Sequence, residues 1–391
     1  MEISYKTIAG ISTRYRATLT VLSMLLLGGV YATYRMAIDG VYLSGLSQRV
    51  PWGLEIILAI FYIGLSAGSL VVSGLYGIFG KLQYKPFART AAFLAILFLA
   101  AALLSIITDQ GRVDRVFTQP FMHLNPRSMF SINPALYFGY IAVCAVYLFA
   151  LFNEKPMLTK AAATVGVCWA VLTHTGTGFI FASVPRELYS SSLLPACFVT
   201  AALSSGTAFM ILLIVALFKV TDRPLDKALI VGLSRLLVSF VLVTLLLNII
   251  ENLHRYIHFA TRSAEIFFLF GGLHSVLFWL GVILLGSLIP LVLLLSRRGD
   301  AIPWILFSSI LVVLGVLCER CLIVLPGLLH PPNLFPGMTL RETVLFENVA
   351  TYSVTFYEVL QALGILAFIG LGVMVGVKVL KLLPTEARSK E

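Results

Sequence analysis

Ionisable side chains inside long apolar stretches are the first feature of this sequence that could do chemistry. Glu55, His174, Glu319, Arg320 and Glu358 each lie within or at the edge of an apolar run. A charged group is costly inside a bilayer, so its presence in a membrane helix suggests a task. Histidine titrates near neutral pH and carboxylates exchange protons with water, so these side chains suit proton-coupled reactions.

The reaction that fits this set of side chains is oxidation of a quinol or reduction of a quinone. The ring enters from the lipid, each of its oxygens needs a hydrogen-bond partner, and each electron transferred is matched by a proton. We expect His174 to donate a hydrogen bond to the quinone and to accept its proton, because it lies in a predicted membrane helix. Aromatic rings on the second and fourth spans would flank the quinone: Tyr62, Tyr137 and Tyr140.

Membrane helices must position these side chains. Of the 391 residues, 59% are hydrophobic and 12% are charged, and the mean hydropathy is +0.97. The apolar runs have the length of a bilayer-crossing helix, and the alternation of a membrane β-barrel is absent. We expect an all-α polytopic membrane protein, a single domain over residues 1–391 in two packed bundles. Its ten predicted helices are roughly 17–38, 53–79, 90–107, 135–152, 161–184, 195–218, 229–250, 273–295, 302–326 and 357–380.

Basic residues divide the predicted loops into two sets. Ten spans place both termini on one side, and that side holds every lysine of the sequence. By the positive-inside rule, both termini are cytoplasmic. The first span lacks a small-residue cleavage site after it, so we expect it to be retained. The formal net charge of +10 is then a topology signal, and no nucleic-acid partner is needed to explain it.

The long connections face outward, and binding is expected there because a helix bundle can hold such loops in place. They are 108–134, 251–272 and 327–356. Asn133-Pro134 indicates a turn in the first of them. Polar side chains at helical spacing also end the seventh span, and the simplest interpretation of them is an interfacial helix end. This quartet is Glu251, His254, Arg255 and His258.

The sequence gives little support for a resident metal or haem. Cys318 and Cys321 form a CxxC pair, but no second pair exists to complete a cluster, so a structural role is favoured. A haem would need two facing axial histidines, and the partner of His174 would be His274, which lies too near the surface. We therefore expect no haem or iron–sulfur cluster in this chain. Small residues at 64–69 and 204–207 predict close helix packing.

Several motifs resemble the NrfD/PsrC family, the membrane subunits of polysulfide-reductase-type oxidoreductases. The run PWGLEIILAIFYIGLSAGS at 51–69 is similar to the second-span signature of that family. Asp109-Gln110-Gly111-Arg112 looks like its Asp-Leu-Gly-Arg element, and HTGTGFIF at 174–181 looks like its His-x-x-x-Gly stretch. Gly286 to Pro290 resembles its Gly-x-x-x-Pro segment. The similarity covers most of residues 50–380.

The resemblance implies a haem-free, quinone-reactive subunit of a respiratory complex, with its pocket near the outer face. Quinone or menaquinone would be the bound substrate. A ferredoxin-like [4Fe-4S] subunit would dock on the outer loops, with further subunits of the complex beside it and membrane lipid around it. Ten spans resemble the longer branch of the family, of the DsrP or Hdr-like menaquinol oxidoreductase type. Such proteins serve electron transport, including anaerobic respiration, in the prokaryotic cytoplasmic membrane.

We expect the following roles for individual residues, from their side-chain chemistry together with this resemblance. Asp109 and Arg112 would shape and charge the outer mouth of the pocket. Glu55 and Glu358 would relay protons, and Arg320 would hold a buried carboxylate, which we expect to be Glu358.

The sequence also departs from the family pattern. Leu322 stands where asparagine is common, Glu55 replaces an apolar residue, and Trp279-Leu280-Gly281 lacks an acid. A secondary transporter and a non-redox membrane anchor stay open as alternatives. A transporter would show polar residues through the full membrane depth and an internal repeat, and neither is visible.

Overall fold

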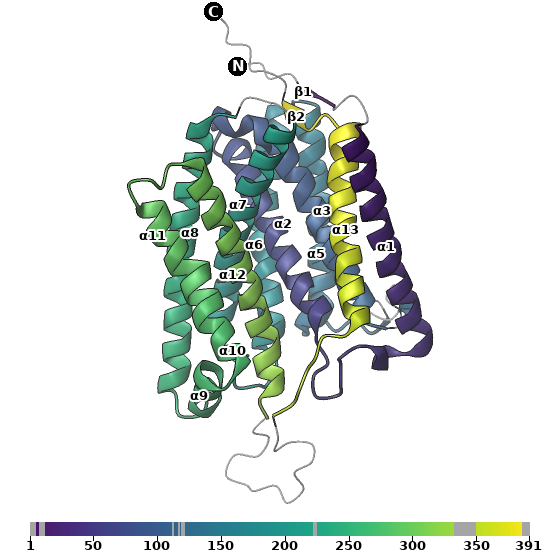
Figure 1. Cartoon of the computed structure of the whole chain (residues 1–391), viewed down its shortest axis with the longest axis vertical. Coiled ribbons are helices and arrows are strands. Elements are labelled where there is room, and N and C mark those ends of the chain that lie inside the picture. Colours follow the sequence, from purple (N-terminus) through teal and green to yellow (C-terminus); the bar gives the residue numbers. More distant parts are fainter. Residues whose placement is uncertain are drawn as a thin grey trace, which may run out of the picture.

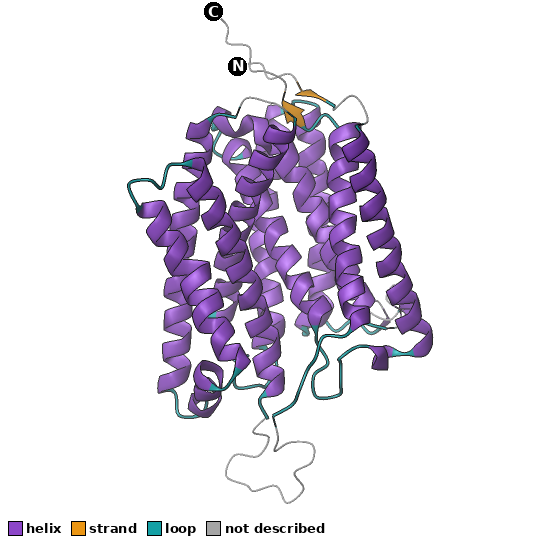
Figure 2. Ribbon diagram, viewed as in Figure 1, coloured by secondary structure: helices purple, strands orange, loops and turns teal. Residues whose placement is uncertain are grey.

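Ten helices long and apolar enough to cross a membrane lie side by side in the described part of the chain (Figures 1 and 2). The computed structural model describes residues 5–7, 12–111, 113–115, 118, 122–221, 225–331 and 349–384. The predicted all-α polytopic class is confirmed. The spanning segments are α1 (Thr13–Asp39), α2 (Leu54–Gly77), α3 (Lys85–Asp109), α5 (Met129–Phe152), α6 (Pro156–Ala182), α7 (Leu194–Val220), α8 (Lys227–Ile257), α10–η4–α11 (Leu273–Val276, Leu277–Leu288 and Ile289–Leu295), α12 (Ile302–Leu329) and α13 (Phe356–Val379).

Short elements occupy the two ends of this array. At one end, η2 (Leu82–Tyr84) precedes α3, and β1 (Tyr5–Lys6) pairs antiparallel with β2 (Leu383–Pro384). At the opposite end lie η1 (Val41–Leu43), η3 (Val113–Arg115) and the nine-residue helix α9 (Arg262–Phe270). We call this opposite end the outer end of the molecule.

Helix α5 begins earlier than predicted. Asn133-Pro134 lies inside the helix and does not form the expected turn. The Asn133 side chain donates from Nδ2 to the carbonyl of Met129, 2.8 Å away on the preceding turn, and to that of Gly176 on α6, 3.0 Å away. These bonds support the helix where proline cannot donate a backbone N–H.

The helices fall into two groups by their contacts. We call α2, α3, α5 and α6 the first helix group, and α7, α8, α10–η4–α11 and α12 the second helix group; within each, the helices pack on one another. Helix α2 is the most buried of the described spans and joins the groups by packing on α7. Helices α1 and α13 pair with each other at the edge of the first group, beside α3 (Figure 1).

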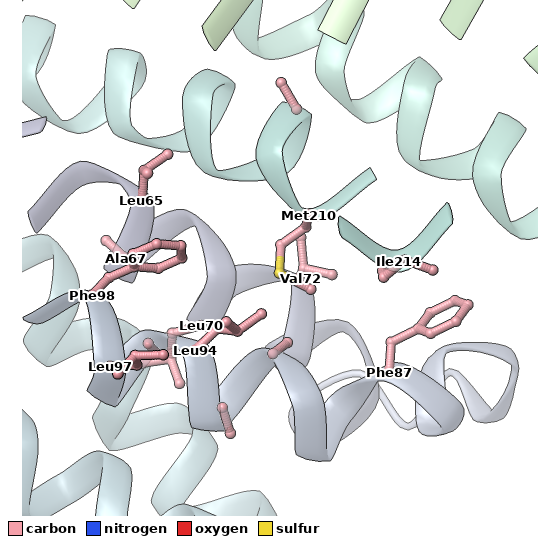
Figure 3. Packing of buried hydrophobic residues seen from close by; sticks show 14 of the residues in the cluster. Leu65, Ala67, Leu70, Val72, Phe87, Leu94, Leu97, Phe98, Met210 and Ile214 are labelled. Carbon is pink, nitrogen blue, oxygen red and sulfur yellow. The ribbon is translucent and has the colours of Figure 1, made fainter. Parts of the chain in front are cut away.

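Small residues allow α2 and α7 to approach closely, as the sequence predicts. A Cβ added to Gly68 would overlap the backbone of Gly206 on α7, so this crossing requires glycine. Around it, large apolar side chains from α2, α3 and α7 interdigitate, as Figure 3 shows for Leu70, Phe98 and Met210. The two groups are therefore held at a fixed distance, which positions their facing polar residues.

The span from Leu273 to Leu295 contains a long π-helical stretch, η4. Pro290 follows it and cannot donate a backbone hydrogen bond to the preceding turn. The backbone N–H of Ile289 instead reaches the carbonyl of Leu284, five residues back, and the Ser287 hydroxyl donates to the carbonyl of Val282, 3.0 Å away. The proline of the predicted Gly-x-x-x-Pro segment thus widens this helix where it packs on α12.

Candidate functional site

Glu358, at the first turn of α13, organises the outer end of the first helix group. Its Oε2 accepts hydrogen bonds from the backbone N–H of Thr355 (2.8 Å), from that residue's hydroxyl (3.1 Å) and from the N–H of Gly45 (3.1 Å). Its Oε1 accepts from the Tyr352 hydroxyl at 2.8 Å, and that hydroxyl in turn accepts from the N–H of Leu54 at 2.8 Å. Glu358 therefore ties the segments before α2 and α13 together.

Glu55, at the first turn of α2, is buried without a hydrogen-bond partner on either carboxylate oxygen. Its polar neighbours are Ser105 and Asp109 of α3 and Glu358 of α13. The Ser105 hydroxyl also has no partner. Buried polar atoms in folded proteins are nearly always hydrogen-bonded, so this region has unused capacity for water or a ligand.

A cavity of about 230 Å³ opens between the four helices of the first group. Asp109 and Gln110 line it at the outer end of α3, and Asn133, Tyr137 and Thr177 line it from α5 and α6. The hydroxyls of Tyr137 and Thr177 are 3.0 Å apart, and Oδ1 of Asn133 has no partner. The remaining wall is apolar and aromatic: Trp52, Ile56, Ala59, Ile60, Ile63, Ile106, Phe130, Pro134, Ile180 and Phe181.

The aromatic wall is built around Trp52, just before α2. Its ring lies 5.9 Å from that of Phe130 and 5.3 Å, edge-on, from that of Phe181. Tyr189, in the connection between α6 and α7, stacks on Trp52 at 6.4 Å. These contacts keep the rings in fixed orientations, so the cavity has an aromatic and largely apolar wall that suits an aromatic ligand.

His174 lies one helical turn deeper than Thr177 and does not line this cavity. The side chain is 2% exposed, and its Nδ1 lies 3.2 Å from the carbonyl of Ala170. A carbonyl oxygen can only accept, so Nδ1 carries a proton in this contact, and Nε2 is left without a partner. The Arg320 guanidinium on α12 is close enough for the two groups to interact electrostatically.

Arg320 is fully buried but does not pair with Glu358, so the predicted ion pair is wrong. Its Nη2 donates weakly to the carbonyl of Phe198 at 3.5 Å, and its guanidinium lies 4.6 Å from the ring of that residue. Glu358 is engaged elsewhere, because α13 packs on α1, α3 and α2. The carboxylate that interacts electrostatically with Arg320 is that of its sequence neighbour Glu319, with no ion pair formed between them. Nε and Nη1 of Arg320 have no hydrogen-bond partner.

The structure brings together only some of the predicted site residues. Asp109 and Tyr137 share the cavity, and Glu55 lies beside Asp109. Tyr62 is buried in the apolar core and is not among the residues that line the cavity. Arg112 lies outside the described residues. Among the residues that are described, no group of three or more His, Cys, Asp or Glu side chains could hold a metal ion.

Sequence reasoning missed two groups of residues. Asn133 was interpreted only as part of a turn and Thr177 was not singled out, because neutral side chains in apolar helices carry no distinctive signal. Glu265 was assigned to a loop, but it lies on α9 and accepts a 2.8 Å hydrogen bond from Nε of Arg255. Of the predicted quartet at the end of α8, Glu251 and Arg255 face inward, whereas the two histidines are exposed.

A model of the polysulphide reductase NrfD family matches residues 42–332. The chain belongs to this family. The matched part includes the cavity and Arg320 and ends before Glu358. The resemblance inferred from the motifs is therefore confirmed. As an NrfD protein with ten apolar helices, the chain is a multi-pass membrane protein of the prokaryotic cytoplasmic membrane.

Relatives within the NrfD family are similar over most of their length. The Hdr-like menaquinol oxidoreductase integral membrane subunit of Archaeoglobus fulgidus is 36% identical, with 99% of this chain and 98% of that protein aligned. A selenate reductase subunit of Mesobacillus selenatarsenatis is 29% identical, with 80% and 82% aligned. A polysulfide reductase subunit of Wolinella succinogenes is 22% identical, with 72% and 95% aligned.

Proposed function

We propose that this chain is the quinone-reactive membrane subunit of a respiratory oxidoreductase complex. It would exchange electrons between menaquinol and an extracytoplasmic [4Fe-4S] subunit of ferredoxin-like type. The cavity of the first helix group is the observation that carries this proposal, because it combines aromatic walls with hydrogen-bonding groups at separate points. The relatives support it, since they are subunits of a menaquinol oxidoreductase, a selenate reductase and a polysulfide reductase.

The cavity supplies a partner for each end of a quinone ring. Asp109 would accept a hydrogen bond from one quinol hydroxyl, and the Tyr137–Thr177 pair would bind the other oxygen. Trp52 and Phe181 would flank the ring. This geometry fixes the ring by its edges and its faces, which is how a small polar set orients a mostly apolar ligand.

Proton transfer is assigned to the acids and the histidine around the cavity. Oxidation of menaquinol to menaquinone releases two electrons and two protons, and the electrons leave to the iron–sulfur partner. Asp109, at the outer end of α3, would pass one proton toward the outer face, with Glu55 beside it. His174 would take up the other through its unpartnered Nε2, one turn below Thr177.

The orientation in the membrane follows from the same proposal. The strands β1 and β2, near the two ends of the described chain, lie at one end of the molecule (Figure 1), and we assign this end, with the lysine-bearing loops, to the cytoplasm. The cavity then lies near the outer face, beneath the long loops on which the partner would dock. The two helix groups would act as two bundles, one holding the quinone and the other supporting it.

A quinol-site inhibitor tests the proposal directly. Saturable fluorescence quenching of a hydroxyquinoline N-oxide by the purified, folded protein is expected, with displacement by menaquinone analogues. Asp109→Asn should weaken binding, because the carboxylate lines the cavity, whereas Asp39→Asn at the outer end of α1 serves as a matched control. Absence of saturable binding in a folded sample would contradict the proposal and favour a non-redox anchor or a transporter.

His174 is tested in the same assay and in the complete complex. His174→Ala should abolish menaquinol oxidation while the protein stays folded, because a proton acceptor is removed. Inhibitor affinity should fall less than in Asp109→Asn, since His174 lies below the cavity wall. Wild-type turnover in this variant would remove His174 from the mechanism.

A further inference from the structure

A small chamber of about 50 Å³ lies in the second helix group, and the proposed quinone chemistry does not use it. Glu251, Asn248 and Arg255 line it from α8, and Glu319 lines it from α12. The volume suffices for one or two water molecules, and the lining offers several polar partners for each. Apolar residues of α7, η4 and α9 close the remaining sides.

The polar residues of α8 form a ladder that descends from the outer end of the helix. Arg255, Glu251 and Asn248 follow one another at intervals of four and three residues, so they share one helical face at successive turns. At the top of this ladder, Arg255 is ion-paired with Glu265 at 2.8 Å and with Glu251 at 3.3 Å. At the bottom, Glu319 adjoins Arg320, which faces His174.

Polar atoms along this path have unmet hydrogen-bonding capacity. Nε and Nη1 of Arg320 and Nε2 of His174 have no hydrogen-bond partner. At the chamber, Oε1 of Glu251 lies 3.3 Å from Nη1 of Arg255 in an ion pair but accepts no hydrogen bond, and the Asn248 side chain lies close enough to interact with Glu319. Buried polar atoms without a protein partner are usually bonded to ordered water. Water in the chamber, and between Arg320 and His174, would satisfy these atoms and link them into one chain.

The buried charged groups between His174 and the outer end of α8 favour the binding of one additional proton, which can move among the acids. Three carboxylates (Glu251, Glu265 and Glu319) face two guanidinium groups (Arg255 and Arg320), all of them buried. One carboxylate is therefore in excess, and an uncompensated buried charge is strongly destabilising. A proton shared among the acids removes the excess, and the chamber water lets it change place.

We propose that this chamber holds water and conducts protons between His174 and the outer face, by way of Glu319 and Glu251. The proton source rests on the proposed function: a proton released from menaquinol enters at His174, and one proton leaves to outer water from the Glu251 end. No bond other than O–H and N–H bonds forms or breaks, and the electrons leave separately to the iron–sulfur partner. Tyr189, which lines the chamber and stacks on Trp52, separates this water from the quinone cavity.

Radiolytic hydroxyl labelling of the wild-type protein tests for the water without any activity assay. Cys197 lines the chamber, and Cys144 of α5 lies in the apolar core; both side chains are buried. Radicals form from bound water, so Cys197 should be labelled several-fold faster than Cys144. Equal, slow labelling of both cysteines would show a dry chamber and overturn the proposal.

Substitution of Glu319 tests proton conduction in the complete complex. Glu319→Gln should slow menaquinol oxidation about tenfold and raise its solvent deuterium isotope effect, with inhibitor affinity unchanged. Glu187→Gln, an acid of the α6–α7 connection outside the chamber, is the matched control. Turnover and isotope effect equal to wild type in Glu319→Gln would overturn the route but leave the quinone site intact. Loss of inhibitor binding in the wild type would instead refute the proposed function.

Discussion

The two helix groups use polar residues in opposite ways. The cavity of the first group is about 230 Å³, is mostly apolar, and has single polar groups with free hydrogen-bonding capacity. The chamber of the second group is about 50 Å³, and the charged residues in its otherwise apolar lining include Arg255, which is ion-paired with Glu251 and Glu265. The first cavity offers isolated polar groups to an apolar molecule, and the second gathers charged side chains that we propose to conduct protons. A membrane bundle can therefore separate substrate binding from charge handling by assigning them to different helices.

The largest effect is expected from breaking the ionic network of the second group. Arg255→Met would leave Glu251 and Glu265 without their cation, and removing one partner of a buried ion pair costs about 3–5 kcal/mol. Thermal unfolding in detergent should show a large loss of stability. Arg35→Met, which breaks the exposed pair with Asp39 on α1, is the control and should change little. Equal melting temperatures of the two variants would mean that the ion pairs of Arg255 do not stabilise the fold.

The next largest effect is weaker binding of a quinol-site inhibitor in the cavity of the first helix group. Tyr137→Phe removes one neutral hydrogen bond to the ligand, which contributes about 0.5–1.5 kcal/mol and so up to about tenfold in the Kd of a quinol-site inhibitor. Tyr147→Phe, on the same helix but bonded to Ser73 in the core, should leave the Kd unchanged. A similar loss in both variants would indicate a general loosening of α5 and not a contact with the ligand.

A smaller effect is expected from substitution of Glu358. This substitution distinguishes a positioning role of Glu358 from a role in proton relay. Glu358→Gln weakens the bonds to Gly45 and Tyr352 and the cap of α13, a loss of about 1 kcal/mol. Proteolysis of the segment before α2 should become faster, whereas the pH profile of menaquinol oxidation should keep its shape. A shifted pH profile would restore the relay role that the sequence suggested for this residue.

The smallest expected effect concerns how the stability of the protein depends on pH through His330, at the outer end of the second helix group. Burial, with the nearby Arg186 charge, lowers the pKa of His330 below its usual range. Because the folded-state pKa lies below the unfolded one, the stability that neutral His330 contributes is present above about pH 6.5 and is lost as the pH falls below it. The melting temperature should fall slightly on acidification, and His330→Gln should flatten that part of the curve. An unchanged curve would contradict the assignment.

The sequence predicted the helices well because length and apolarity alone define a membrane span. All ten predicted spans correspond to helices of the described structure. Their ends were less accurate, and α5 shows why: Asn133-Pro134 is a turn signal locally, but bonds from the Asn133 side chain to α5 and α6 carbonyls stabilise the helix through it. Tertiary contacts thus overrode a local preference.

The members of the proposed site were chosen partly from the family resemblance and partly from residue type. Asp109 matches a family motif, Tyr137 is an aromatic residue on the fourth predicted span, and both line the cavity. The pairing of Arg320 with Glu358 failed because it depends on which helices are neighbours, and adjacent helices in the sequence need not pack together. Helix α13 packs on α1, at the opposite end of the chain. The Arg255–Glu265 pair was missed for the same reason, since it depends on how α9 folds back on α8.

The pairing of α1 with α13 also has a consequence for biosynthesis. The first and last spans contact each other closely, with Gly29 against Gly364 and a hydrogen bond from the Gln361 amide to the Thr33 hydroxyl. A ribosome that inserts the spans in order delivers α1 first, and its chief helix partner emerges last. Helix α1 therefore lies in the membrane without its main partner until all the intervening spans have been inserted. Its docking would mark the insertion of α13, and chains truncated before α13 would leave the α1 surface unpaired.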